Sequence, residues 1–109
     1  MNANPNARLS IVAYRPKPGK DKELMSLTQE HVPYLRSLGF ATERPNIIAT
    51  AGDGTVIEVF EWTEGALAKA HAHEGLGEMW QRYSAVCDFA PLNTLEETTM
   101  MFANFTVTN

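Results

Sequence analysis

The sequence predicts an α+β domain in which one antiparallel sheet carries two helices on one face. Two observations predict it. Segments with the alternating apolar pattern of strands are separated by segments with the 3.6-residue apolar period of helices, in the order β-α-β-β-α-β. The chain has 109 residues, a length that suits one compact domain. We therefore expect a single domain at 8–109, preceded by a flexible polar tail at 1–7.

The first strand is expected at Arg8–Tyr14, where side chains alternate between two sides of an extended segment. The first helix is expected at Lys20–Leu38, with Gly39 as its C-terminal stop and Phe40 folded back on the last turn. Pro33 removes a backbone N–H inside this helix, so we expect a kink there. The apolar arc of the helix holds Leu24, Leu27, His31, Leu35 and Leu38.

The middle of the chain is predicted to form a β-hairpin. Pro45–Thr50 and Val56–Trp62 are its strands, and the Gly-Asp-Gly centre of residues 51–55 suits a tight connection with positive φ. Thr63 is expected to cap a second helix that runs to Glu74. Gly75 and Gly77 interrupt this helix, and the helical period continues over 76–89. A last strand is expected at 100–107.

This order of elements is that of the ferredoxin-like arrangement. In two of the predicted strands, Val56–Trp62 and Met100–Val107, both sides are largely apolar. Two helices can cover only one face of a sheet, and a second copy of the same sheet is the simplest cover for the other. The sequence therefore predicts a homodimer that associates through the open sheet face.

Charge and composition exclude several classes of protein. With 9 basic and 13 acidic side chains the net charge is -4, which argues against a nucleic-acid-binding protein. No apolar run is long enough to cross a bilayer, and the N-terminal residues do not resemble a signal peptide, so we expect no membrane association. The single cysteine, Cys87, fits a reducing compartment, and we expect a cytoplasmic location.

Two histidines on the second helix are candidates for chemistry. His71 shares an arc with Leu67 and Ala70, so we expect it to point inward and His73 to point outward. An inward imidazole is suited to act as a general base on a phenol, and the alternative is a core histidine bonded to a backbone carbonyl. On a helix the two rings of His-x-His diverge, and no third ligand lies nearby, so we predict no metal and no other cofactor.

Three other polar residues interrupt apolar stripes. His31 lies in the middle of the first helix's stripe, and Glu58 and Asn104 interrupt sides of strands. A buried titratable group needs a partner or a cavity, so we expect His31 and Glu58 to join His71 in one catalytic pocket, with Asn104 contacting the ligand. The alternative is structural: a helix–sheet hydrogen bond for the histidine, and for the carboxylate a salt bridge to Arg15, Arg44 or His31.

Aromatic residues are numerous enough to line a pocket for a small, flat aromatic molecule. Their alternative role is packing in a small core. The candidates for binding such a molecule are Tyr14, Phe60, Trp62, Trp80 and Tyr83.

Two segments carry a resemblance to a known family: Val12–Gly19, which opens into a helix, and Val59–His71, a strand ending in Trp followed by a capping Thr and a short helix with His. Over residues 8–107 the chain resembles the dimeric α+β barrel superfamily, most nearly the antibiotic-biosynthesis-monooxygenase-like and stress-responsive barrel proteins. The resemblance implies a homodimer and a cofactor-independent monooxygenase acting on a phenolic or quinol-like compound.

Other activities of that superfamily fit less well. Its haem-degrading members carry an Asn on the first strand and a Trp before the His, whereas here His71 precedes Trp80 and the first strand has no Asn. Isomerase or lyase chemistry on a small acid would need a cationic anchor from Arg15, Arg44 or Arg82. The alternative to an enzyme is a non-catalytic barrel that binds a small molecule or acts in a stress response.

Overall fold

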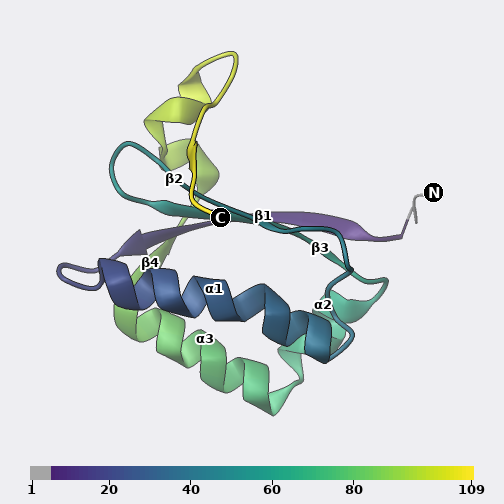
Figure 1. Cartoon of the computed structure of the whole chain (residues 1–109). Helices are drawn as coiled ribbons and strands as arrows, with labels where there is room; N and C mark the ends of the chain where they lie inside the picture. The colour runs from purple at the N-terminus through teal and green to yellow at the C-terminus, as the bar shows by residue number, and fades with distance from the viewer. Residues whose placement is uncertain (1–5) are drawn as a thin grey trace.

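One antiparallel sheet with two long helices packed beneath it organises the chain (Figure 1). The computed structural model describes residues 6–109, so most of the tail expected at 1–7 lies outside the described residues. The strands, in sheet order β4-β1-β3-β2-β5, are β1 (Arg8–Pro16), β2 (Ile47–Thr50), β3 (Val56–Trp62), β4 (Cys87–Ala90) and β5 (Thr106–Val107). The helices are α1 (Asp21–Ser37), α2 (Ala66–His71) and α3 (Glu74–Val86), and two 3-10 turns, η1 (Leu92–Thr94) and η2 (Glu96–Thr99), follow β4.

The central pair of strands fixes which side chains face the helices. β1 and β3 pair antiparallel from Arg8 opposite Trp62 to Tyr14 opposite Val56, and paired residues share a face of the sheet. The face that holds Tyr14 and Trp62 packs against α1 and α3 and contains the main core. The predicted α+β class is confirmed, and the antiparallel sheet with helices is compatible with a ferredoxin-like arrangement.

Helix α1 ends as its sequence predicts. Gly39 has φ 78°, the N–H of Phe40 donates to the Leu35 carbonyl at 2.9 Å, and the N–H of Gly39 donates to the Arg36 carbonyl at 2.9 Å. These two bonds form a Schellman motif, which satisfies carbonyls that the helix leaves unpaired. Pro33 lies inside the helix, which the structure assigns without a break.

The hairpin of β2 and β3 is also confirmed, with the first strand shorter than predicted. Gly54 has φ 91°, as the Gly-Asp-Gly sequence of the turn suggests. The N–H of Ala51 donates to the Thr55 carbonyl at 2.8 Å and closes the turn. Hydrogen bonding from Thr55 lowers the pKa of the Asp53 carboxyl, whose Oδ1 accepts the Thr55 N–H at 2.9 Å.

The C-terminal part of the chain departs from the prediction. The helix expected to continue to Phe89 ends at Val86, and the next residues form β4 along the edge of β1. Tyr14 pairs with Phe89, their rings 5.5 Å apart in an edge contact. Strand pairing prevails over the helical period here because it gives hydrogen-bond partners to the backbone of β1. The strand predicted at 100–107 is wrong except for Thr106–Val107.

The break between the second and third helices also differs from expectation. It falls at Ala72–His73 rather than at the two glycines, because the His73 side chain accepts the Leu76 N–H at 3.2 Å and caps α3. The expectation that Thr63 caps a helix is wrong. Its hydroxyl donates to the Gly39 carbonyl at 2.8 Å and so ties the end of β3 to the end of α1.

Substitution of the two glycines of α3 by alanine is expected to affect the free energy of unfolding differently. A methyl group added at Gly77 would meet no atom within 4 Å, so Gly77→Ala is expected to raise the free energy of unfolding by about 0.5–1 kcal/mol. A methyl group at Gly75 would collide with the Tyr34 hydroxyl, so Gly75→Ala is expected to bring no such gain. Urea unfolding of both variants checks this, and equal midpoints would contradict it.

The second face of the sheet is only partly covered. The segment that follows β4 packs over one half of it and buries Leu95 (Figure 1). The members of this smaller core are Ala13, Ala49, Ala51, Ile57 and Leu95. The other half is apolar and exposed: Leu9 is 60% exposed, Ile11 47%, Ile47 46% and Val107 62%.

Candidate functional site

A cluster of buried polar side chains lies between the helices and the sheet. Glu58 of β3 is 0% exposed, and its Oε1 accepts the Tyr14 hydroxyl at 2.7 Å. The same oxygen lies 2.8 Å from Nδ1 of His31, which is 3% exposed on α1. Of the partners expected for Glu58, His31 is the one found, whereas Arg44 pairs with Glu61 at 3.2 Å. We call Glu58, His31, Tyr14, Tyr83 and Thr28 the buried cluster.

Tyr83 and Thr28 complete the buried cluster. The ring of Tyr83 stacks on that of Tyr14 with centroids 4.7 Å apart, and its hydroxyl donates to Thr28 Oγ1 in a long contact of 3.4 Å. Thr28 in turn donates to the Leu24 carbonyl at 2.8 Å. Burial, followed by the charge of Glu58, raises the pKa of both tyrosines far above the usual value, so both hydroxyls stay protonated and act as donors.

Two atoms of the buried cluster have no hydrogen-bond partner among the described residues: Glu58 Oε2 and His31 Nε2. The 2.8 Å contact between His31 Nδ1 and Glu58 Oε1 holds one proton between the two groups and leaves His31 Nε2 and Glu58 Oε2 as the atoms without partners. The buried cluster therefore presents two unpartnered polar atoms, a carboxyl oxygen and a ring nitrogen, in the core of the protein.

His71 does not point inward, contrary to prediction. Its side chain is exposed, its Nδ1 contacts the Leu67 carbonyl at 2.8 Å, and its ring lies 5.4 Å from that of Trp80. His73, expected to point outward, is half-buried against Tyr34 and Phe40. The buried side of α2 is formed by Ala66 and Ala70, whereas Leu67, which shares the arc of His71, is itself 44% exposed. His73 lies beyond the end of α2 and caps α3, so it leaves the helical phase from which its outward direction was predicted.

The other candidate residues are divided between the core and the surface. Phe60 lies in the main core and packs its ring edge-on to His31 at 5.6 Å. Trp62 is buried at the end of β3, where its indole N–H donates to the Ser10 hydroxyl at 2.7 Å. Trp80 is half-buried beside His71, and Asn104 is exposed in the C-terminal segment. Sequence reasoning missed Thr28, although its position one turn before His31 on the apolar stripe was a usable signal.

The thiol of Cys87 is expected to be unreactive. Burial, and to a smaller extent the charge of Asp88, raises its pKa to about 11, so at pH 8 only about one thiol in a thousand is ionised. We expect alkylation by iodoacetamide at pH 8 to be on the order of a hundred-fold slower than in the urea-unfolded chain. The exposed Ser84, changed to cysteine, supplies a fast-reacting control in the same chain. Equal rates for the two thiols would contradict the expectation.

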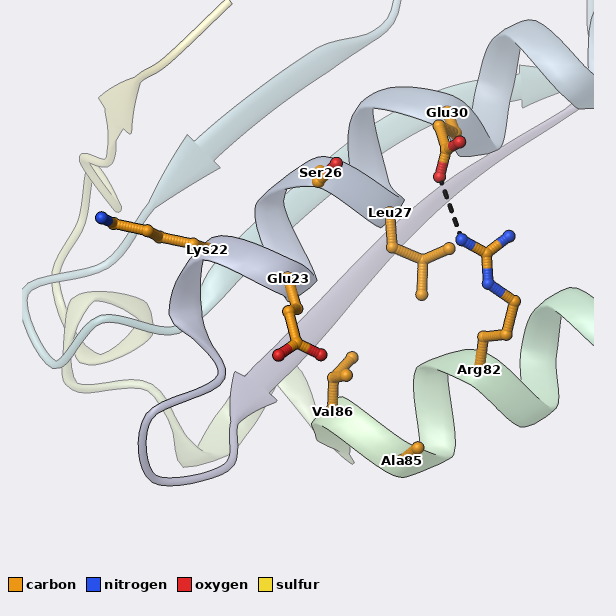
Figure 2. A pocket seen from close by; sticks show the side chains of 8 residues that line it. All are labelled: Lys22, Glu23, Ser26, Leu27, Glu30, Arg82, Ala85 and Val86. Carbon is orange, nitrogen blue, oxygen red and sulfur yellow. Dashed lines mark hydrogen bonds and ion pairs between the residues drawn. The ribbon is translucent and has the colours of Figure 1, made fainter.

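Two surface grooves run between α1 and α3. One, of ≈ 470 Å³, is lined by residues that include Leu27, Val86 and the ion pair of Glu30 with Arg82, as Figure 2 shows. The other, of ≈ 520 Å³, is also bordered by Glu30 and Arg82. The rest of its lining is formed by Pro33, Tyr34, Gly75, Glu78 and Met79. Neither groove is lined by His31, Glu58 or His71, so the buried cluster is closed to the surface at both.

Comparison of the chain with protein-family models, curated proteins and solved structures finds no match. Within residues 6–109, no helix has the length and apolar character needed to cross a membrane. The same residues contain no group of three or more His, Cys, Asp or Glu side chains arranged to hold a metal ion.

Proposed function

We propose that the chain is a cofactor-independent monooxygenase-like enzyme that acts on a small phenolic or quinol-like compound in the interior between helices and sheet. The observation that carries the proposal is the pair of unpartnered polar atoms on His31 and Glu58, two buried residues joined by a 2.8 Å hydrogen bond. A phenolic hydroxyl both donates and accepts hydrogen bonds, so it is a suitable partner for these atoms, and the neighbouring Tyr14, Tyr83 and Phe60 rings suit an aromatic ligand.

In this proposal His31 is the general base. Nε2 takes the phenolic proton, and Glu58 holds the imidazole by Nδ1 and stabilises the imidazolium that forms. Tyr14 donates to Glu58 and holds its carboxyl group in position. The phenolate reduces dioxygen directly: conversion of a phenol to a quinone places one oxygen atom in the product and releases the other as water. The electrons balance without a further reductant.

The same proposal includes a homodimer. Leu9, Ile11, Ile47 and Val107 lie on one face of the sheet by strand register, and each is about half exposed or more. In the C-terminal segment on that side of the sheet, Met100, Met101 and Phe102 are also exposed. Contiguous apolar surface of this kind favours association, and a second copy of the sheet covers it with the same residues from both sides.

Oxygen uptake tests the activity. Metal-stripped protein is incubated with dihydroxynaphthalenes, anthrones and catechols, and wild type is compared with His31→Gln and His71→Gln. We expect saturable uptake by wild type and by His71→Gln, and a loss of about 10²-fold or more in His31→Gln, in line with the contribution of a general base. Loss in His71→Gln alone would instead assign the base to His71, as the sequence suggested.

The second candidate is a non-catalytic barrel that binds a small molecule. Neither His31 nor Glu58 lines an interhelical groove. This arrangement is expected if the two side chains serve only the packing of the interior and contact no substrate. No uptake above the uncatalysed rate with any compound would support this candidate over the enzyme.

A further inference from the structure

We propose that a ligand reaches the buried cluster through the seam between α1 and α3, and that the Glu30–Arg82 ion pair is a latch across this seam. The inference rests on the proposed function for the identity of the ligand, a small phenol. The route itself is argued from the grooves, the residues below them and the strength of the contacts that close them.

The two interhelical grooves meet at the latch. Glu30 and Arg82 line both grooves, and their side chains join across the seam at 3.3 Å (Figure 2). Figure 2 also shows Leu27 and Val86 directed into the space between the helices. The ion pair therefore stands between two hollows of ≈ 470 and ≈ 520 Å³, each large enough to admit a small aromatic molecule.

The grooves lie over the buried cluster. Their floor residues Leu27, Met79 and Val86 are nearly buried and belong to the same core as Tyr14 and Tyr83. On α1, His31 follows Leu27 by one helical turn and stands next to Glu30, while on α3 Tyr83 stands next to Arg82, between Met79 and Val86. The His31 and Tyr83 rings lie 5.5 Å apart. Movement of the floor residues would therefore open a way to both His31 and Tyr83.

The seam is the weakest boundary of this core. The latch is an ion pair whose two side chains are more than half exposed, and such pairs contribute little to stability. Pro33 cannot donate to the Gln29 carbonyl, so α1 lacks one hydrogen bond beside the second groove. Gly75 and Gly77 weaken the first turns of α3, and Met79 is a flexible floor residue. The opposite boundary is the sheet, in which β1 pairs along its length with β3 and along part of it with β4.

Chemical modification of His31 tests the route without a substrate. The probe is diethyl pyrocarbonate, which carbethoxylates accessible imidazole nitrogens, and tryptic peptides are read by mass spectrometry. His31 is the one histidine in the peptide 23–36, and the exposed His71 is the internal reference, with fragment ions separating it from His73 on the same peptide. The variants are Arg82→Gln, which removes the latch, and Ala85→Phe, which fills the first groove.

We expect His31 to be modified up to about five-fold faster in Arg82→Gln, the range that loss of an exposed ion pair allows. Ala85→Phe should slow it several-fold, and the matched control Gln81→Phe, exposed on α3 outside both grooves, should leave it unchanged. In urea below the unfolding transition the rate should change little, because local opening exposes little surface.

Three results would overturn the route: equal rates in Arg82→Gln, Ala85→Phe and wild type, a rate that rises with urea as steeply as global unfolding does, or no modification of His31 before the chain unfolds. None of these readouts depends on oxygen uptake. A seam that opens in a protein without oxygenase activity would refute the proposed function and leave the route standing. Oxygen uptake that Ala85→Phe leaves unchanged would refute the route and leave the proposed function standing.

Discussion

Glu58→Ala is expected to lower the free energy of unfolding by about 2–5 kcal/mol, the cost of two buried hydrogen bonds lost together with the packing of the side chain. The change leaves the Tyr14 hydroxyl and His31 Nδ1 without their common acceptor in the core, where neither can turn to water. It also leaves a cavity between helices and sheet. Urea unfolding followed by circular dichroism measures the effect.

Two variants give this result its meaning. Glu61→Ala removes a carboxylate from the same strand but from the opposite, partly exposed face, and should change stability far less. Tyr14→Phe removes one donor to Glu58 and should cost about 1–3 kcal/mol. If Glu58→Ala unfolds at the same urea concentration as Glu61→Ala, the buried cluster is not a source of stability and its hydrogen bonds are not as described.

Ile11→Glu is expected to convert the proposed dimer to a monomer. Ile11 lies at the centre of the exposed apolar half of the sheet, opposite Val59, so in a symmetric pair the new carboxylate would be buried near its own copy. A penalty of several kcal/mol raises the dissociation constant by about 10³-fold. Sedimentation equilibrium at micromolar concentration should give twice the 12.1 kDa chain mass for wild type and the chain mass for the variant.

The control adds the same charge elsewhere. Gln81→Glu places a carboxylate on the exposed side of α3, away from the sheet, and should leave the dimer intact. A wild-type chain that sediments as a monomer at these concentrations would refute the dimer. Association that persists in Ile11→Glu would place the interface on another surface.

Much of the fold could be predicted because local signals agreed with one another. The arc of Leu24, Leu27 and Leu35 places α1 against the sheet, and Gly39 and Gly54 occupy the positive-φ positions that the α1 stop and hairpin turn require. Within the site, the sequence marked His31 and Glu58 because each interrupts an apolar stripe. It also named His31 among the possible partners of the carboxylate.

Other features depended on contacts between distant parts of the chain. Cys87–Ala90 continues the apolar period of a helix, yet it becomes a strand because the edge of β1 offers backbone partners. His71 was assigned to the interior because it shares an arc with Leu67 and Ala70, but the side of α2 that packs on the core is that of Ala66 and Ala70, and Leu67 and His71 are both exposed. Local periodicity contains neither piece of information.

The sequence by itself determined the class of fold, the amphipathic face of α1 and the entry of His31 and Glu58 into the core, because each follows from the spacing of apolar side chains along one element. The tertiary structure alone decided that Tyr14, His31 and Glu58 meet at one carboxylate oxygen. It also brought Glu30 of α1 and Arg82 of α3 together in an ion pair. Such meetings depend on strand register and helix packing, which are set by the whole core at once.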